Sequence, residues 1–200
     1  MQLKHVALVI ADIGSYTRFI RLHKNTLLHA EEIISQLLET IIERASFPLT
    51  LNKLEGDAAL LYADMGGAEA AAARDIAQQV TAFFFAFHAK AEELSSSRAN
   101  CPCDACQHIL DLRLKAVLHH GVVAIRTIRQ FEELTGEDVI LVHRLLKNGV
   151  AKPEYILMSA SFHCLAGNLP GYRGEKGEES YDDLGRVSTV VFSPLPAIVD

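Results

Sequence analysis

Two short segments constrain the possible fold of this chain more than its composition does. In VALVIADIGSYTRFI an apolar run with β-branched residues ends at Asp12, and in LNKLEGDAALLYAD a turn at Gly56 places Asp57 between two apolar runs. Short apolar runs bounded by turn residues are typical of buried strands, and a Gly-Asp pair between them is typical of a hairpin. Each segment therefore predicts a buried strand with one carboxylate at its end.

Two carboxylates at the ends of neighbouring strands predict a site for a divalent cation and a nucleotide. Hard cations prefer oxygen ligands, and Mg²⁺ usually shares its coordination shell with substrate phosphates. The residues alone leave another interpretation open, in which Asp12 caps the following helix and Asp57 serves the turn. For the pair in these two segments, we favour the metal site.

Length and charge narrow the class of protein. The chain has 200 residues, half of them hydrophobic, and we expect one domain over residues 1–200. Its formal net charge of −6 argues against a nucleic-acid partner, since such proteins usually carry a basic face. No apolar run reaches bilayer length, and Asp12 interrupts the first one, so we expect neither a membrane span nor a signal peptide. Three of the four cysteines crowd into one short loop, which favours a reduced, cytoplasmic protein over a disulfide scaffold.

Hydrophobic periodicity predicts an α+β fold. Strands are expected at 3–11, 48–54, 58–62, 110–118, 122–128, 155–159 and 181–192, with a turn at His119-His120-Gly121. Helices are expected at 15–44, 68–94, 137–148 and briefly up to 165, and loops at 95–108 and 168–180. The first half of this order matches a ferredoxin-like βαββαβ core, a mostly antiparallel sheet with helices packed on one face.

Four motifs in this order resemble one family. They are Ile10-Ala11-Asp12-Ile13-Gly14-Ser15-Tyr16-Thr17, Lys53-Leu54-Glu55-Gly56-Asp57, Leu118-His119-His120-Gly121, and Gly136-Glu137-Asp138-Val139 followed by Arg144. Together they are similar to the motifs of class III adenylate and guanylate cyclase catalytic domains, over residues 5–195. One such motif alone is weak, whereas the ordered set is fairly specific. The variant motifs indicate a divergent bacterial branch of that superfamily.

The resemblance implies a reaction, metals and an assembly. It implies conversion of ATP to cyclic AMP and pyrophosphate, a phosphorus–oxygen lyase reaction, with two Mg²⁺ or Mn²⁺ ions at the interface of a homodimer. The metal ligands it implies are Asp12, the backbone carbonyl of Ile13, and Asp57. It implies base recognition by Lys53 and Glu133, and stabilisation of the triphosphate in the transition state by the catalytic residue Arg144.

Two departures from the family pattern keep a second hypothesis open. Ile140 stands where the family has an asparagine that orients the ribose, and an isoleucine side chain makes no hydrogen bond. The lysine that binds the terminal phosphates has no clear match before the last strand. Because losing one preorganised donor commonly costs about 10²–10³ in rate, the alternative is a catalytically inactive module that binds a nucleotide or another ligand in signalling.

The segment NCPCDACQH forms a cysteine-rich loop at about 99–108. Cys101, Cys103, Cys106 and His108 are soft or borderline ligands of the kinds that zinc takes in a tetrahedron. Their spacing is not a standard zinc pattern, so a loop with free thiols is the alternative. A third hypothesis for the whole chain is a scaffold or metal sensor built around this loop.

Overall fold

The structure, a computed structural model, describes residues 2–16, 19–20 and 27–195. Its strands are β1 (Gln2–Gly14), β2 (Thr50–Glu55), β3 (Ala58–Asp64), β4 (Arg113–Ile128), β5 (Phe131–Thr135), β6 (Tyr155–Ser159), β7 (Tyr172–Tyr181) and β8 (Gly185–Pro194). Its helices are α2 (Leu27–Arg44), α3 (Glu69–Ser97), α4 (Asp104–Gln107), the 3₁₀ turn η2 (Ile109–Asp111), α5 (Glu137–Leu146) and α6 (Ala160–Ala166). Part of the helix expected at 15–44 lies outside the described residues.

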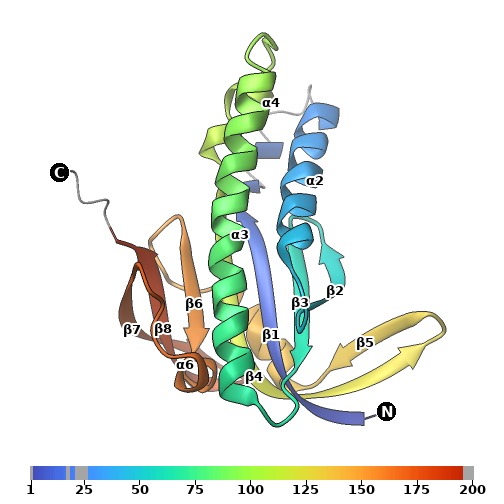
Figure 1. Cartoon of the computed structure of the whole chain (residues 1–200), viewed down its shortest axis with the longest axis vertical. Coiled ribbons are helices and arrows are strands. Elements are labelled where there is room, and N and C mark those ends of the chain that lie inside the picture. Colours follow the sequence, from blue (N-terminus) through green and yellow to red (C-terminus); the bar gives the residue numbers. More distant parts are fainter. Residues whose placement is uncertain (1, 17–18, 21–26, 196–200) are drawn as a thin grey trace.

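One sheet organises the described chain (Figure 1). Its strand order is β2-β3-β1-β4-β6-β8-β7, and β5 pairs with β4 beside this path. The pairing of β4 with β6 is parallel, and the pairings of the other described strands are antiparallel. This is the mostly antiparallel sheet that the sequence predicts.

Both faces of the sheet are covered. Along β1, Ala7, Val9, Ala11 and Ile13 pack into the core beneath α2 and α3, the two long helices that run side by side in Figure 1. Val6, Leu8 and Ile10 point the other way and pack against α5. Because successive side chains of a strand alternate between faces, a strand apolar at every position needs cover on both sides. The expectation of helices on one face only is wrong, because α5 covers the second face.

The strand β4 is longer than expected. The sequence predicts a turn at His119-His120-Gly121, but β4 runs unbroken from Arg113 to Ile128. It pairs with β1 in one register from Gly14↔Arg113 to Gln2↔Ile125. A partner strand of this length supplies hydrogen bonds through the His-His-Gly segment, so the glycine stays extended rather than turning.

The C-terminal hairpin also differs from expectation. The segment expected as a loop at 168–180 contains β7, which pairs along its full length with β8. Its side chains are mostly polar and exposed because it is an edge strand, and such strands lack the apolar alternation that periodicity detects. None of the helices within the described residues is long and apolar enough to cross a membrane.

Candidate functional site

The fold brings Asp12 and Asp57 together. Asp12 lies opposite Ala58 in the β1–β3 pairing, one residue beyond Asp57 in the β2–β3 hairpin. The backbone N–H of Ile13 donates to the backbone carbonyl of Asp57 at 3.0 Å, which fixes the hairpin against the end of β1. Gly56 has φ +70°, a left-handed conformation that glycine adopts without strain. Two segments distant in sequence thus place two carboxylates at one end of the sheet.

The two carboxylates interact electrostatically. Burial and the negative charge of Asp57, opposed by Lys115, raise the pKa of Asp12 from 3.8 to about 6. Burial likewise raises the pKa of Asp57. The side chain of Asp12 is only 15% exposed. A pair of partly buried like charges is unfavourable when both are ionised, and a bound cation relieves that repulsion.

Lys115 is the charged neighbour of this pair that the sequence analysis missed. It lies opposite Asp12 in the β1–β4 pairing, and its Nζ is 4.0 Å from Asp12 Oδ2. A Cβ on Gly14 would lie 3.0 Å from Cε of Lys115, so glycine leaves room for the lysine to pass. Tyr155 of β6 is the next residue across the sheet, opposite Lys115. A cation therefore lies beside the two carboxylates on the face that α5 covers.

The proposed base-reading residues have other contacts within this chain. Lys53 Nζ lies 3.2 Å from Glu55 Oε1, and Glu55 also contacts His143 Nε2 at 2.9 Å. These contacts join β2 to α5. Glu133 lies opposite Arg126 in the β4–β5 hairpin, which projects from the sheet in Figure 1.

Arg144 and Ile140 are both exposed on α5. Arg144 Nη2 lies 2.9 Å from Asp183 Oδ2, in the turn between β7 and β8. Ile140, which was expected at the position of the ribose-orienting asparagine, has 53% of its surface exposed. Arg144 thus pairs with Asp183 rather than with the carboxylates at the end of β1.

A buried polar network lies farther along β4. His119 is 4% exposed, and its Nδ1 and Nε2 lie 2.8 Å from Ser159 Oγ and from Asp138 Oδ1 respectively. The other oxygen of Asp138 accepts from the backbone N–H of Val122 at 2.6 Å. The hydrogen bond with His119 lowers the pKa of Asp138. His119 is therefore a packing residue that joins α5 to the sheet.

Gly121 makes this network possible, which gives a stability prediction. A Cβ at this position would lie 2.1 Å from Cγ of Asp138, so Gly121→Ala must displace the carboxylate. We expect Gly121→Ala to lower the free energy of unfolding by about 1–3 kcal/mol, measured by urea denaturation. Gly149→Ala is the matched control, because its Cβ would meet only Glu179 at 3.9 Å. Equal stability of the two variants would contradict the assignment.

The cysteine loop contains a short helix and faces α2. Cys101, Cys103 and Cys106 lie close to one another, while His108 Nδ1 pairs with Asp111 Oδ2 at 2.8 Å. The imidazole beside the three thiols belongs to His29 of α2, which sequence spacing did not indicate.

Residues 34–155 match the family described as protein of unknown function, DUF2652. The chain belongs to the DUF2652 family. A relative in Mycobacterium tuberculosis (strain ATCC 25618 / H37Rv), the uncharacterized protein Rv2561/Rv2562, is 38% identical over 126 residues. That alignment covers 63% of this DUF2652 chain and 57% of the relative, so the chain spans little more than half of the relative's length.

Solved structures show the fold of this DUF2652 protein. The adenylyl cyclase CyaB from P. aeruginosa superposes with a TM-score of 0.72 at 16% identity, covering 100% of this chain and 98% of that one. The guanylyl cyclase Cya2 gives 0.70 at 12% identity, covering 100% and 96%. The guanylate cyclase domain of RhGC from Catenaria anguillulae, in complex with GTP, gives 0.64 at 14% identity, covering 98% and 100%. The DUF2652 chain therefore has the class III cyclase catalytic-domain fold, as its motifs predicted.

Proposed function

We propose that this domain binds a nucleoside triphosphate together with divalent cations at Asp12 and Asp57. The observation that carries the proposal is the pairing of two partly buried carboxylates, with a raised pKa at each, at the end of β1. Carboxyl groups with a pKa raised by burial and by a neighbouring negative charge cluster at functional sites. The cyclase fold of the chain supports the same conclusion by analogy.

The residues present fit Mg²⁺ or Mn²⁺. Asp12 and Asp57 supply hard oxygen ligands, and the backbone carbonyl of Ile13 is the third ligand that we propose. Lys115 adds a positive charge 4.0 Å from Asp12, where it can attract a phosphate oxygen. Bound divalent cations would balance the charge of the triphosphate and make the ribose 3′-hydroxyl easier to ionise.

The reaction that we propose is conversion of ATP to cyclic AMP and pyrophosphate. Lys53 and Glu133 would read the adenine, and Arg144 would stabilise the developing charge on the phosphates. Within one chain, Lys53 pairs with Glu55 and Arg144 pairs with Asp183, rather than with Asp12 or Asp57. This pairing supports a homodimer in which one chain supplies Asp12 and Asp57 and the other supplies Lys53 and Arg144.

Exposed apolar side chains support the homodimer. Ile128 and Phe131 lie at the tip of the β4–β5 hairpin and are 48% and 61% exposed, and Ile140 lies exposed on α5. Burying such side chains against a second chain is favourable by about 25 cal/mol per Å² of apolar surface. Apolar residues on a projecting hairpin are typical of a protein–protein contact.

A second candidate function is nucleotide binding without turnover. Ile140 favours it, because its exposed side chain offers no hydrogen bond to a ribose. In this candidate, Asp12 and Asp57 still hold the cations and phosphates, and the domain acts as a binding module in signalling. Cyclic AMP formation from ATP with Mn²⁺ separates the two candidates.

Ile140→Asn tests the ribose contact. We expect this variant to raise cyclic AMP formation about 10-fold or more over the wild type, because it restores one oriented donor. The measurement is product formed per minute by purified protein with ATP and Mn²⁺, and Ile140→Ala is the control that removes the side chain without adding a donor. A folded Ile140→Asn protein that binds ATP and shows no gain over Ile140→Ala would contradict our alignment of α5.

A further inference from the structure

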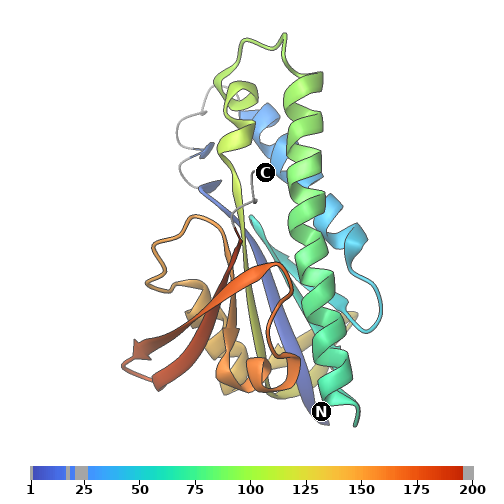
Figure 2. The ribbon, with the colours of Figure 1, turned by 60° about the vertical axis from the view of Figure 1, so that its left-hand side comes forward.

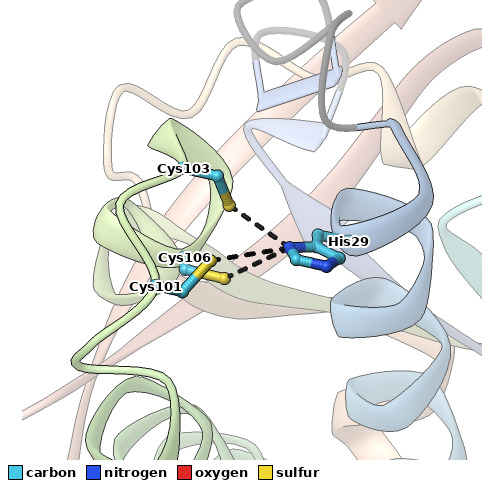
Figure 3. A group of neighbouring side chains, drawn as sticks. All are labelled: His29, Cys101, Cys103 and Cys106. Carbon is cyan, nitrogen blue, oxygen red and sulfur yellow. Dashed lines mark hydrogen bonds between the residues drawn. The ribbon is translucent and has the colours of Figure 1, made fainter.

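A second group of candidate ligands lies apart from the aspartate pair, between α2 and the loop that follows α3. Figure 3 shows the imidazole of His29 pointing at three thiols. His29 Nδ1 lies 3.4 Å from Cys103 Sγ, 3.7 Å from Cys101 Sγ and 3.8 Å from Cys106 Sγ. The four candidate ligand atoms all lie within 4.8 Å of one another. One imidazole nitrogen and three sulfurs therefore converge on one point.

We propose that His29, Cys101, Cys103 and Cys106 bind one zinc ion. Zinc in structural sites is tetrahedral, with Zn–S near about 2.3 Å and Zn–N near about 2.0–2.1 Å, so adjacent N and S ligands stand about 3.6 Å apart. The three N···S distances of 3.4, 3.7 and 3.8 Å lie on both sides of that value. Three cysteines with one histidine is a ligand set that structural zinc uses.

The spacing of the four atoms favours a single ion over a cluster or a disulfide. An iron–sulfur cluster distributes its four protein ligands over two or more irons, so ligands on different irons stand farther apart than the ligands of one shared ion. The three cysteines are free thiols, and a disulfide between any two of them would leave the third without a partner. One tetrahedral ion uses all three sulfurs and the histidine together.

The proposed ligand set differs from the one expected from the sequence in having His29 in place of His108. His108 is close to the cysteines in sequence, but its Nδ1 contacts Asp111. His29 is 72 residues from Cys101 and comes from a different element. A site shared between α2 and the loop would join two parts of the chain, whereas a site within the loop would close only the loop.

The surroundings of the four residues suit a structural ion. Cys106 is buried, and Gln107 Nε2 donates to the carbonyl of Cys101 at 2.9 Å, which holds the loop in shape. Arg98 and Glu32 form an ion pair at 2.8 Å between the same two elements. The loop continues through η2 into β4, the strand that carries Lys115. The ion would therefore fix α2 and the start of β4 in relation to each other.

The experiment measures zinc in the full chain. Protein purified under reducing conditions with zinc in the medium is analysed by mass spectrometry of the metal, and we expect about one zinc per chain. His29→Ala and Cys103→Ser should each lose most of that zinc, and His29→Cys should retain it because thiolate replaces imidazole. His108→Ala and Cys164→Ser are matched controls, because both residues lie outside the four, and both should keep the wild-type content.

Cobalt substitution provides a readout that does not depend on the variants folding. Wild-type protein freed of zinc and loaded with Co²⁺ should show the intense visible bands of a tetrahedral site and the charge-transfer bands of thiolate ligands. Chelation of zinc from the wild type should also lower the thermal midpoint, and zinc should restore it. Neither result depends on nucleotide binding, so failure of the proposed function leaves this test unaffected.

Three results would overturn the proposal. The first is wild-type protein without zinc that gives Co²⁺ spectra lacking thiolate bands. The second is loss of zinc in His108→Ala with retention in His29→Ala, which would show that His108, within the loop, is the fourth ligand. The third is iron with inorganic sulfide in the purified chain, which would replace the single ion by a cluster.

Discussion

Asp57→Asn is expected to weaken Mn²⁺-dependent binding of ATP by about 100-fold or more, which corresponds to about 3 kcal/mol. The reason is that an amide replaces one of the two charged oxygen ligands of the proposed cations, and hard cations bind carboxylate far more strongly than amide. Asp57 lies in the hairpin turn and is partly exposed, so the variant is expected to fold. Isothermal titration of a non-cyclisable ATP analogue, with and without Mn²⁺, measures the effect.

Asp64→Asn is the matched control for this binding experiment. Asp64 is the last residue of β3, the strand that follows Asp57, and its carboxylate pairs with Lys4 at 2.7 Å. The chemical change is identical, but the residue lies at the far end of the strand from Asp57. ATP affinity that falls equally in both variants, or in neither, would contradict a cation site at Asp12 and Asp57.

The second large effect concerns pH and the stability of the metal-free protein. The folded chain holds the proton of Asp12 up to about pH 6, whereas the unfolded chain loses it near 3.8. The folded state therefore binds more protons between these values, and raising the pH through that range removes stability. Asp12→Asn does not titrate, so its free energy of unfolding should exceed that of the wild type by about 1–3 kcal/mol at pH 7.

Urea denaturation at several pH values in the presence of a chelator measures this difference. The advantage of Asp12→Asn should shrink toward zero as the pH falls from 6 to 4. Asp64→Asn should behave in the opposite sense, because a hydrogen bond from Lys4 lowers the pKa of Asp64. That variant should lose up to about 1 kcal/mol at neutral pH and nothing in acid. A pH-independent difference for Asp12→Asn would show that the carboxylate is not strained in the folded state.

Much of the fold could be predicted because its signals are local. The apolar run of β1 and the Gly-Asp turn between β2 and β3 identify strands by themselves, and both are confirmed. The expected turn at 119–121 is wrong, because pairing with β1 extends β4 through a sequence that reads as a turn. Hydrophobic periodicity did not predict β7, because an exposed edge strand has no apolar alternation. The extent of β4 and the existence of β7 both depend on pairing with another strand, which local sequence patterns do not reveal.

The candidate site likewise contains some residues that local motifs predict and others that only the fold identifies. The proximity of Asp12 and Asp57 follows from two motifs and the order of the strands. Lys115 could be found only from the register that places it opposite Asp12, since a lysine inside an apolar strand has no signature of its own. His29 likewise could be found only from the packing of α2 against the cysteine loop. A residue whose partners lie on other helices or strands can be assigned to a site only once the fold is known.

Cyclic AMP formation by the purified chain from ATP and Mn²⁺, with Asp57→Asn as the blank, distinguishes cyclisation from nucleotide binding alone. We expect product above the blank in the wild type and more product in Ile140→Asn. Absence of product from wild type and Ile140→Asn alike, in preparations that bind ATP with Mn²⁺, would contradict cyclisation and leave a nucleotide-binding module.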